Sequence, residues 1–387
     1  MENLNKLYNK RVILGITMSI LLIAMCTVPT WAKLPGTQSK IADYTEGGHL
    51  ETDLNAGFMA EWWYLNGDVR LVASDGEKRD GALHVVLAHQ ESPLMMGPSG
   101  MQLSHMPTFY GLHFDDGTAN IRLNEMYIPY SMVSDYIALN TPYVDYAYPN
   151  PGGAGGVKRL YGSVVPGYNL EYTFDNVTMD LFFQTNVNKT IDESSQPLNF
   201  TTYEHSYGTL HGSIIIDGKK YTVTKGEGYF DHMIPVSNQP WPMDMHGWSW
   251  FEVTTREYQA VAYATRSLDD GYDNYSYKHL TLLNKHNGKV LEEYSTDEIT
   301  ITEEEWIGEP EFNRQRPNMV TFSTPDLNVI VNAKSVVDLN MSRPDQIGFV
   351  DFMAFQPENA TIQYNGDVET GSAFYEYLVS DWGVIYS

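Results

Sequence analysis

The stretch "AEWWYLNG", residues 60–67, places one acid, Glu61, directly before three aromatic residues. In a β-strand, neighbouring side chains point to opposite faces, so Glu61 and Trp63 share one face while Trp62 and Tyr64 share the other. If the face of Glu61 is buried, its carboxylate must find a partner or take up a proton. Glu61 is therefore either a structural brace held by hydrogen bonds or an acid that works in catalysis.

A second group of acids and aromatic residues lies in "KGEGYFDHMIP", residues 225–235. Tyr229 and Asp231 are two residues apart and share one face of a strand, while His232 points to the other. A dry pocket keeps a carboxylic acid neutral, so Asp231 in such a pocket could donate a proton. Alternatively, backbone amides or Tyr and Trp donors satisfy Asp231, and it braces the fold. Of the two acids, Asp231 is the better candidate for catalysis and Glu61 for a brace.

Three further stretches repeat this mixture of acids, histidines and aromatic residues. "QPWPMDMHGWSWFE" supplies Trp248 and Trp250, and the closing "GSAFYEYLVSDWG" places Glu376 between two tyrosines. Upstream, "YEHSYGTLHG" contributes His205. We predict that an apolar ligand is bound by Glu61, Trp63, Tyr64, His232, Trp248, Trp250 and Glu376.

The chain lacks the usual spacings of metal sites and of serine hydrolases. Its 11 histidines include no His-x-His or His-Glu-x-x-His pair, and no Gly-x-Ser-x-Gly elbow occurs. A metal held by Asp231, His232, Asp244 and His246 is the weaker alternative. We therefore predict no metal and no cofactor.

Alternating and β-branched runs dominate the chain and predict an all-β, antiparallel fold. Asp217-Gly218 separates two such runs by two residues, as in a hairpin, and Asn287-Gly288 ends another. Beyond the first 32 residues, the only candidate for a helix is "TDEITITEEEW", residues 296–306.

A faint duplication indicates two domains of similar build. "EWWYLNGDVRL" leads to "LHVVLAHQES" and then to "YGLHFDDGTA", while "GWSWFEVTTRE" leads to "YQAVAYATRS" and then to "LTLLNKHNGKV". Both halves run from an aromatic strand through an alternating strand to an apolar strand with a glycine turn. In a chain of 387 residues, we expect an N-terminal barrel over residues 46–203 and a C-terminal barrel over residues 204–387.

The first 32 residues have the layout of an export signal, with an uncleaved membrane anchor as the alternative. Three basic residues precede the apolar run 12–25, and the small residues Thr30 and Ala32 mark a cleavage position. Cleavage leaves 21 basic and 48 acidic residues, a net charge of −27. This charge argues against nucleic acid and anionic lipid as partners. We predict an exported protein, secreted, periplasmic or at the cell surface, with no stable membrane insertion after cleavage.

Three of these motifs resemble those of a known family. "EWWYLNG", the Gly-x-Gly-Tyr-x-Asp-His pattern of "GEGYFDH" and the closing "GSAFYEY" are similar, in the same order, to signature blocks of the carotenoid 1,2-hydratase and AttH-like family. The resemblance implies two lipocalin-like β-barrels in tandem, with an apolar pocket near their junction. In the hydratases, a Tyr-x-Asp pair and an upstream histidine are implicated; the matching residues here are Tyr229, Asp231 and His205.

Residues and resemblance together predict a cofactor-free hydratase or related lyase that acts on a hydrophobic, isoprenoid-like small molecule. Addition of water to an alkene needs a proton donor, here Asp231 supported by Tyr229. Aromatic faces then stabilise the developing cation by about 1–2 kcal/mol each. A non-catalytic carrier of apolar ligands is the alternative, because a barrel fold does not fix function.

Overall fold

The computed structural model describes residues 46–50, 59–97, 100–116, 118–149, 156–191, 200–235, 245–267, 274–309, 314–333, 337–340 and 349–380. The predicted export signal, residues 1–32, lies outside these ranges. Within them, no helix has the length and apolar character of a membrane span.

The N-terminal unit is one antiparallel sheet in the order β4-β3-β2-β1-β10-β9-β8-β7-β6-β5, with a short 3-10 helix, η1 (Tyr130–Asp135), after β4. Its strands are β1 (Met59–Ala73), β2 (Lys78–Met96), β3 (Gln102–Phe114), β4 (Ala119–Pro129), β5 (Val144–Ala147), β6 (Lys158–Ser163), β7 (Gly167–Phe174), β8 (Val177–Ile191), β9 (Phe200–Ile216) and β10 (Lys219–Pro235).

The C-terminal unit is a second antiparallel sheet in the order β14-β13-β12-β11-β22-β21-β19-β18-β15, with β20 also paired to β21 and β16 paired to β17 separately. Its elements are β11 (Met245–Thr254), β12 (Tyr258–Ser267), β13 (Tyr277–Asn284), β14 (Val290–Ser295), η3 (Thr296–Glu298), β15 (Thr300–Glu304), β16 (Ile307–Glu309), β17 (Arg314–Arg316), β18 (Met319–Ser323), β19 (Leu327–Asn332), β20 (Val337–Asn340), β21 (Phe349–Tyr364) and β22 (Asp367–Ser380).

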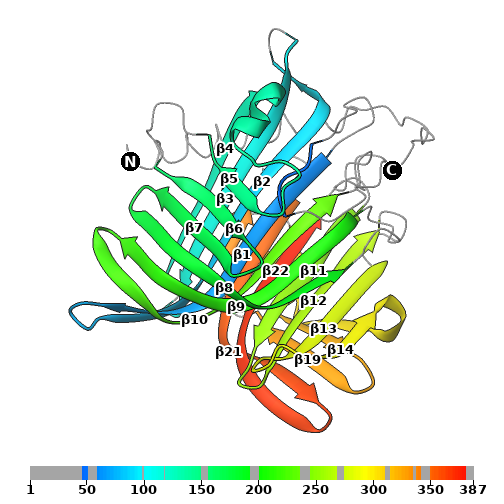
Figure 1. Cartoon of the computed structure of the whole chain (residues 1–387). Helices are drawn as coiled ribbons and strands as arrows, with labels where there is room; N and C mark the ends of the chain where they lie inside the picture. Colours follow the sequence, from blue (N-terminus) through cyan, green and yellow to red (C-terminus); the bar gives the residue numbers. More distant parts are fainter. Residues whose placement is uncertain are drawn as a thin grey trace. The chain divides into compact units, whose positions relative to one another are not determined.

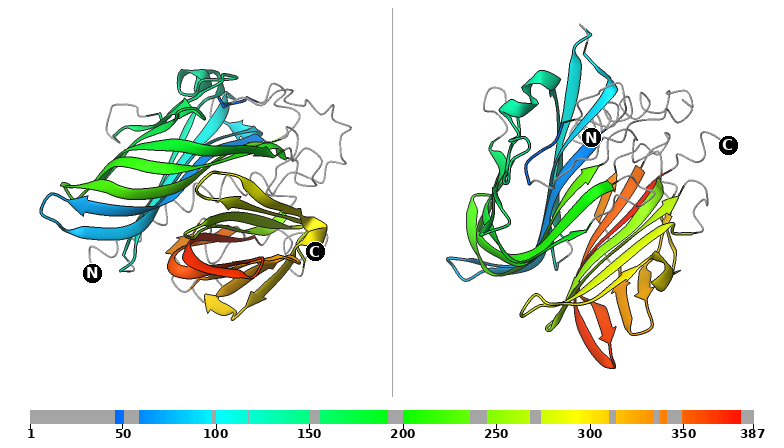
Figure 2. Two further views of the ribbon diagram at one scale, coloured as in Figure 1. Left: turned by 60° about the horizontal axis from the view of Figure 1, so that its bottom comes forward. Right: turned by 45° about the vertical axis from the view of Figure 1, so that its right-hand side comes forward.

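The two sheets share a strand order. In each, the first strand lies between the second strand and the last, and a meander of four strands leads to one edge. Each sheet is strongly curved around its own apolar core (Figures 1 and 2). The predicted fold class, two lipocalin-like antiparallel barrels in tandem, is confirmed. The chain divides into compact units between residues 241 and 242, and the predicted boundary between residues 203 and 204 falls within β9.

Local turn chemistry follows the sequence at the predicted hairpin but not at the predicted helix. Asp217 and Gly218 join β9 to β10 with φ angles of 52° and 80°, the left-handed conformation that a two-residue hairpin turn requires. The helix expected at residues 296–306 is wrong: a 3-10 turn over Thr296–Glu298 leads directly into β15. The alternation of "TITE" fits the period of a strand, and it prevails over the helical pattern.

A row of glycines crosses the middle of the N-terminal sheet. Gly67 in β1 lies opposite Gly228 in β10, which lies opposite Gly208 in β9. A β-carbon on Gly67 would lie 2.4 Å from Cδ1 of Leu210, and one on Gly208 would lie 2.9 Å from Cζ of Phe183. These core side chains therefore pack directly on the backbone of the sheet. This packing accounts for the glycine of "EWWYLNG" and the second glycine of "GEGYFDH".

Candidate functional site

The pairing of β1 with β10 divides the predicted site residues between two faces of the N-terminal sheet. Trp63 and Phe230 belong to the apolar core that the sheet encloses. Because side chains alternate along a strand, Glu61 and His232 point to the same inner face as these two core residues. Tyr64, Tyr229 and Asp231 lie on the outer face.

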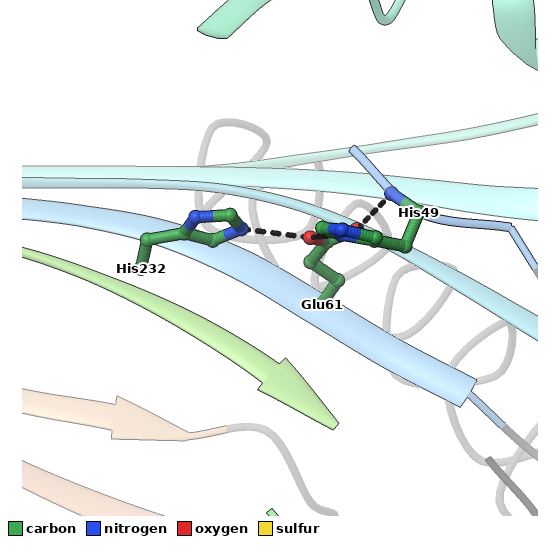
Figure 3. A group of neighbouring side chains, drawn as sticks. All are labelled: His49, Glu61 and His232. Carbon is green, nitrogen blue, oxygen red and sulfur yellow. Dashed lines mark hydrogen bonds and ion pairs between the residues drawn. The ribbon is translucent and has the colours of Figure 1, made fainter. Parts of the chain in front are cut away.

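On the inner face, the carboxylate of Glu61 is fully buried and accepts four hydrogen bonds. The backbone N–H and Nδ1 of His49 lie 2.7 Å from Oε2 and 2.8 Å from Oε1. His232 Nε2 lies 2.7 Å from Oε1, and His89 Nε2 lies 2.7 Å from Oε2. The two imidazoles shown in Figure 3 point at the carboxylate from different elements, the segment 46–50 and β10. Glu61 is thus the centre of a buried polar cluster.

A second layer of side chains supports this cluster. Glu91 Oε1 lies 2.9 Å from His89 Nδ1 and accepts a hydrogen bond from Ser104 Oγ at 2.6 Å. The ring of Trp63 stacks on His232, with ring centroids 4.8 Å apart, and its indole N–H donates to a backbone carbonyl at 3.1 Å. We call His49, Glu61, His89, Glu91 and His232 the Glu61 cluster.

The electrostatics of the Glu61 cluster make Glu61 an anion. Burial alone would raise the pKa of Glu61, but attraction to His49 and hydrogen bonds from the three imidazoles outweigh burial and hold this pKa well below its ordinary value. Burial lowers the pKa of His89, yet the carboxylates of Glu91 and Glu61 raise it to about 10. Burial dominates at His232, whose pKa lies below its ordinary value. Glu61 is therefore a poor proton donor at neutral pH, and its carboxylate serves as a hydrogen-bond acceptor or as a ligand.

On the outer face, Asp231 lies among aromatic side chains and is only 4% exposed. The indole N–H of Trp62 donates to Asp231 Oδ1 at 3.2 Å. The ring of Tyr229 is fully buried and lies edge-on to Tyr64, with centroids 6.5 Å apart, and 5.7 Å from the ring of Tyr207. The structure therefore brings Asp231, Tyr229 and Tyr64 together on one face, away from Glu61, Trp63 and His232.

For His205, the third predicted catalytic residue, the structure describes only the position of the backbone. It lies directly opposite Asp231 in the ladder between β9 and β10. Its side chain lies outside the described part of the structure, as do the side chains of Asp244 and His246.

The C-terminal unit repeats the tryptophan–acid pair of the N-terminal unit. Trp248 Nε1 donates to Glu376 Oε2 at 3.1 Å, and Glu376 lies opposite Trp250 in the ladder between β11 and β22. The register is the same as in the N-terminal unit, where Trp62 donates to Asp231, the residue opposite Tyr64. Both pairs lie on the face opposite the core of their own sheet. Trp248, Trp250 and Glu376 are thus brought together, in a different unit from the other predicted ligand-binding residues.

Three members of the Glu61 cluster escaped the sequence-based predictions: His49, His89 and Glu91. A signal existed for two of them, since "LAHQES" spaces His89 and Glu91 two residues apart and so places them on one face of a strand. His49 lies in "GGHL", which has no strand period, and only the folded chain brings it to Glu61.

No family model matches the chain, and no curated protein matches it by sequence. Solved structures do match its fold. A candidate AttH from Nitrosomonas europaea superimposes with a TM-score of 0.57 at 14% identity, covering 87% of this chain and 98% of that one. Kievitone hydratase from Nectria haematococca gives 0.51 at 11% identity, covering 90% and 99%. CghA, solved with Sch210972, gives 0.56 at 12% identity, covering 84% and 89%.

The chain has the AttH-like fold. The resemblance of the three motifs to the AttH-like family is thereby confirmed at the level of fold. At identities of 11–14%, the likeness establishes architecture and leaves the chemistry to the residues of this chain. In this chain the candidate chemistry lies on two faces of one sheet, with the hydrogen-bonded Glu61 anion on the inner face and Asp231, bonded to Trp62, on the outer face.

Proposed function

We propose that this protein is an exported hydratase or related lyase that acts on a hydrophobic, isoprenoid-like small molecule and needs no cofactor for the reaction. Export is supported by the order of basic, apolar and small residues in the first 32 positions. The reaction class is supported by the shared fold with kievitone hydratase. The observation that carries the proposal is the position of Asp231, a nearly buried acid among the aromatic side chains Trp62, Tyr64 and Tyr229.

The proposed reaction uses Asp231 as its general acid. The carboxyl proton passes to one carbon of the alkene, whose π electrons form the new C–H bond and leave a cation on the other carbon. The faces of Tyr64 and Tyr229 stabilise this cation until a water molecule adds to it. The oxonium then loses a proton to the Asp231 carboxylate, which restores the acid. Glu61 cannot take this role, because its pKa is held well below the ordinary value.

The experiment is an Asp231→Asn variant assayed on acyclic terpenoids that carry a terminal trisubstituted alkene, with a mass gain of one water as the readout. The amide keeps the size and the hydrogen bond of the carboxyl group but has no acidic proton. We expect kcat to fall by about two to four orders of magnitude with the melting temperature nearly unchanged. Glu376→Gln is the matched comparison, because Glu376 accepts the same tryptophan hydrogen bond in the other unit; we expect it to change KM rather than kcat.

A second candidate function is a non-catalytic carrier of apolar ligands. The observation that favours it is the hydrogen bond from Trp62 to Asp231, which gives this carboxyl group a structural partner. A carrier and an enzyme differ in the same experiment. If the wild type hydrates no substrate and Asp231→Asn binds a fluorescent fatty acid as the wild type does, Asp231 is a brace and the carrier is correct.

A further inference from the structure

We propose that the Glu61 cluster binds one divalent transition-metal ion, with His49 Nδ1, His232 Nε2 and Glu61 Oε1 as its protein ligands. This site lies on the inner face of the N-terminal sheet, opposite to Asp231, and does not depend on the proposed reaction. It also departs from the absence of metal that the sequence spacings predict, because its ligands are brought together only by the fold.

The three ligand atoms converge from separate parts of the chain. They lie within 4.8 Å of one another, and they come from the segment 46–50, from β1 and from β10. The imidazole nitrogens lie 2.8 Å (His49) and 2.7 Å (His232) from Oε1 of Glu61. Ligand bonds of about 2.0–2.1 Å to a tetrahedral ion place ligand atoms roughly 3.3 Å apart. To admit the ion, each nitrogen must therefore move about half an ångström away from Oε1, and the two imidazole nitrogens must approach each other by up to about 1.5 Å.

The donor set specifies the class of metal. Two imidazoles and one carboxylate suit Zn²⁺ and its neighbours among the first-row divalent ions, whereas Ca²⁺ and Mg²⁺ prefer oxygen ligands alone. Three protein ligands leave a fourth position, which a water molecule can fill. All three ligand residues are almost completely buried, so an ion held here ties the segment 46–50 to β1 and β10.

A second layer of side chains orients the carboxylate ligand. His89 donates to Oε2 of Glu61 and so fixes the carboxylate with Oε1 toward His49 and His232. Glu91 in turn orients His89, and Ser104 donates to Glu91. Such chains of a carboxylate, a histidine and a hydrogen-bonded ligand commonly orient the ligands of bound metals.

The charges of the buried carboxylates give an independent reason to expect a bound cation. Glu61 and Glu91 bring two carboxylates into a fully buried region, where their described partners are histidines and Ser104. His89 bonds a carboxylate through each ring nitrogen and so cancels one of the two charges; a divalent cation supplies the remaining positive charge while His49 and His232 stay neutral, the form that binds metal. The second oxygen of Glu91 is also buried and has no hydrogen-bond donor among the described residues.

The test begins with the metal content of the purified full chain. Plasma mass spectrometry after dialysis should find about one first-row ion per chain. A chelator should remove the ion and lower Tm, and added Zn²⁺ should restore Tm. Glu91→Gln, which leaves the three ligands in place, should weaken Zn²⁺ binding by about 10- to 100-fold.

His49→Gln and His232→Gln should each abolish stoichiometric binding, whereas His84→Gln should not. His84 is the matched control, a buried histidine on β2 that lies outside the Glu61 cluster. If the ligand variants do not fold, the wild type is stripped of metal with a chelator and titrated with Co²⁺. Bound Co²⁺ gives visible ligand-field bands, which show whether the site binds a metal ion. A wild type that contains no metal and shows neither Co²⁺ bands nor a Tm shift with Zn²⁺ overturns the proposal and leaves the cluster as a hydrogen-bonded brace.

Discussion

His232 Nε2 lies 2.7 Å from Oε1 of Glu61, although 171 residues separate the two along the chain. The contact is diagonal, because His232 is directly opposite Trp63 in the ladder between β1 and β10. It joins the first strand of the N-terminal unit to the last one. The Glu61 carboxylate thus stabilises the pairing of β10 with β1. Removing its negative charge should lower the free energy of unfolding by more than the loss of an ordinary contact does.

The first prediction is that Glu61→Gln destabilises the N-terminal unit by about 3–5 kcal/mol, the usual cost of breaking a buried ionic network. The amide retains one acceptor oxygen, but its NH₂ group faces imidazole N–H donors. Urea unfolding followed by circular dichroism measures the change, and hydrogen exchange locates it in β1 and β10. Asp80→Asn, which breaks an exposed pair with Arg70, is the control and should have no measurable effect. Equal losses of unfolding free energy in Glu61→Gln and Asp80→Asn would contradict this account of Glu61.

The second prediction concerns the glycine row. A β-carbon at Gly67 would lie 2.4 Å from Cδ1 of Leu210 and 2.5 Å from the carbonyl oxygen of Glu227, and the second atom belongs to the backbone. Gly67→Ala should therefore lower the free energy of unfolding by at least about 1–3 kcal/mol. The control is Gly97→Ala, whose new β-carbon would meet nothing closer than 3.5 Å. Thermal melts of the two variants decide, and a Gly67→Ala protein as stable as the control contradicts the packing argument.

Strand alternation predicted which residues share a face, and it did so correctly at both motifs. Glu61 and Trp63 point inward together, and Tyr229 and Asp231 point outward together. Alternation could not show which face is buried, because "EWWY" places aromatic residues on both. The seven residues predicted to bind one ligand are therefore divided between two faces and two units.

The rest of the site depends on contacts that no local pattern encodes. The hydrogen bond from Trp62 to Asp231 spans 169 residues and requires the register between β1 and β10. His49 reaches Glu61 from a segment with no strand period. The tryptophan–acid pair of Trp248 and Glu376 has the same origin, since only the ladder between β11 and β22 brings them together.

A pair of buried histidines on β2 and β3 gives the N-terminal unit a sensitivity to acid. Nε2 of His113 lies 3.1 Å from Nδ1 of His84, and the ring of His84 packs on Phe109 with centroids 4.6 Å apart. A β-carbon on Gly111 would lie 2.2 Å from the ring of His84, so the ring rests directly on the backbone of β3. Burial lowers the pKa of His113 to about 4, and burial together with the nearby His113 holds the pKa of His84 well below its ordinary value.

The third prediction follows from these lowered pKa values. Because the unfolded chain takes up a proton on His113 near pH 6.5 and the folded chain only near pH 4, stability is complete above pH 6.5 and is lost as the pH falls between these values. Between pH 7 and pH 5, the free energy of unfolding of the wild type should fall by about 2 kcal/mol more than that of His113→Gln, whose side chain cannot titrate. Urea unfolding at both pH values measures this difference. His211→Gln, at an exposed histidine, should keep the wild-type pH dependence. If the wild type and His113→Gln lose the same stability between pH 7 and pH 5, His113 is not the acid-sensitive group.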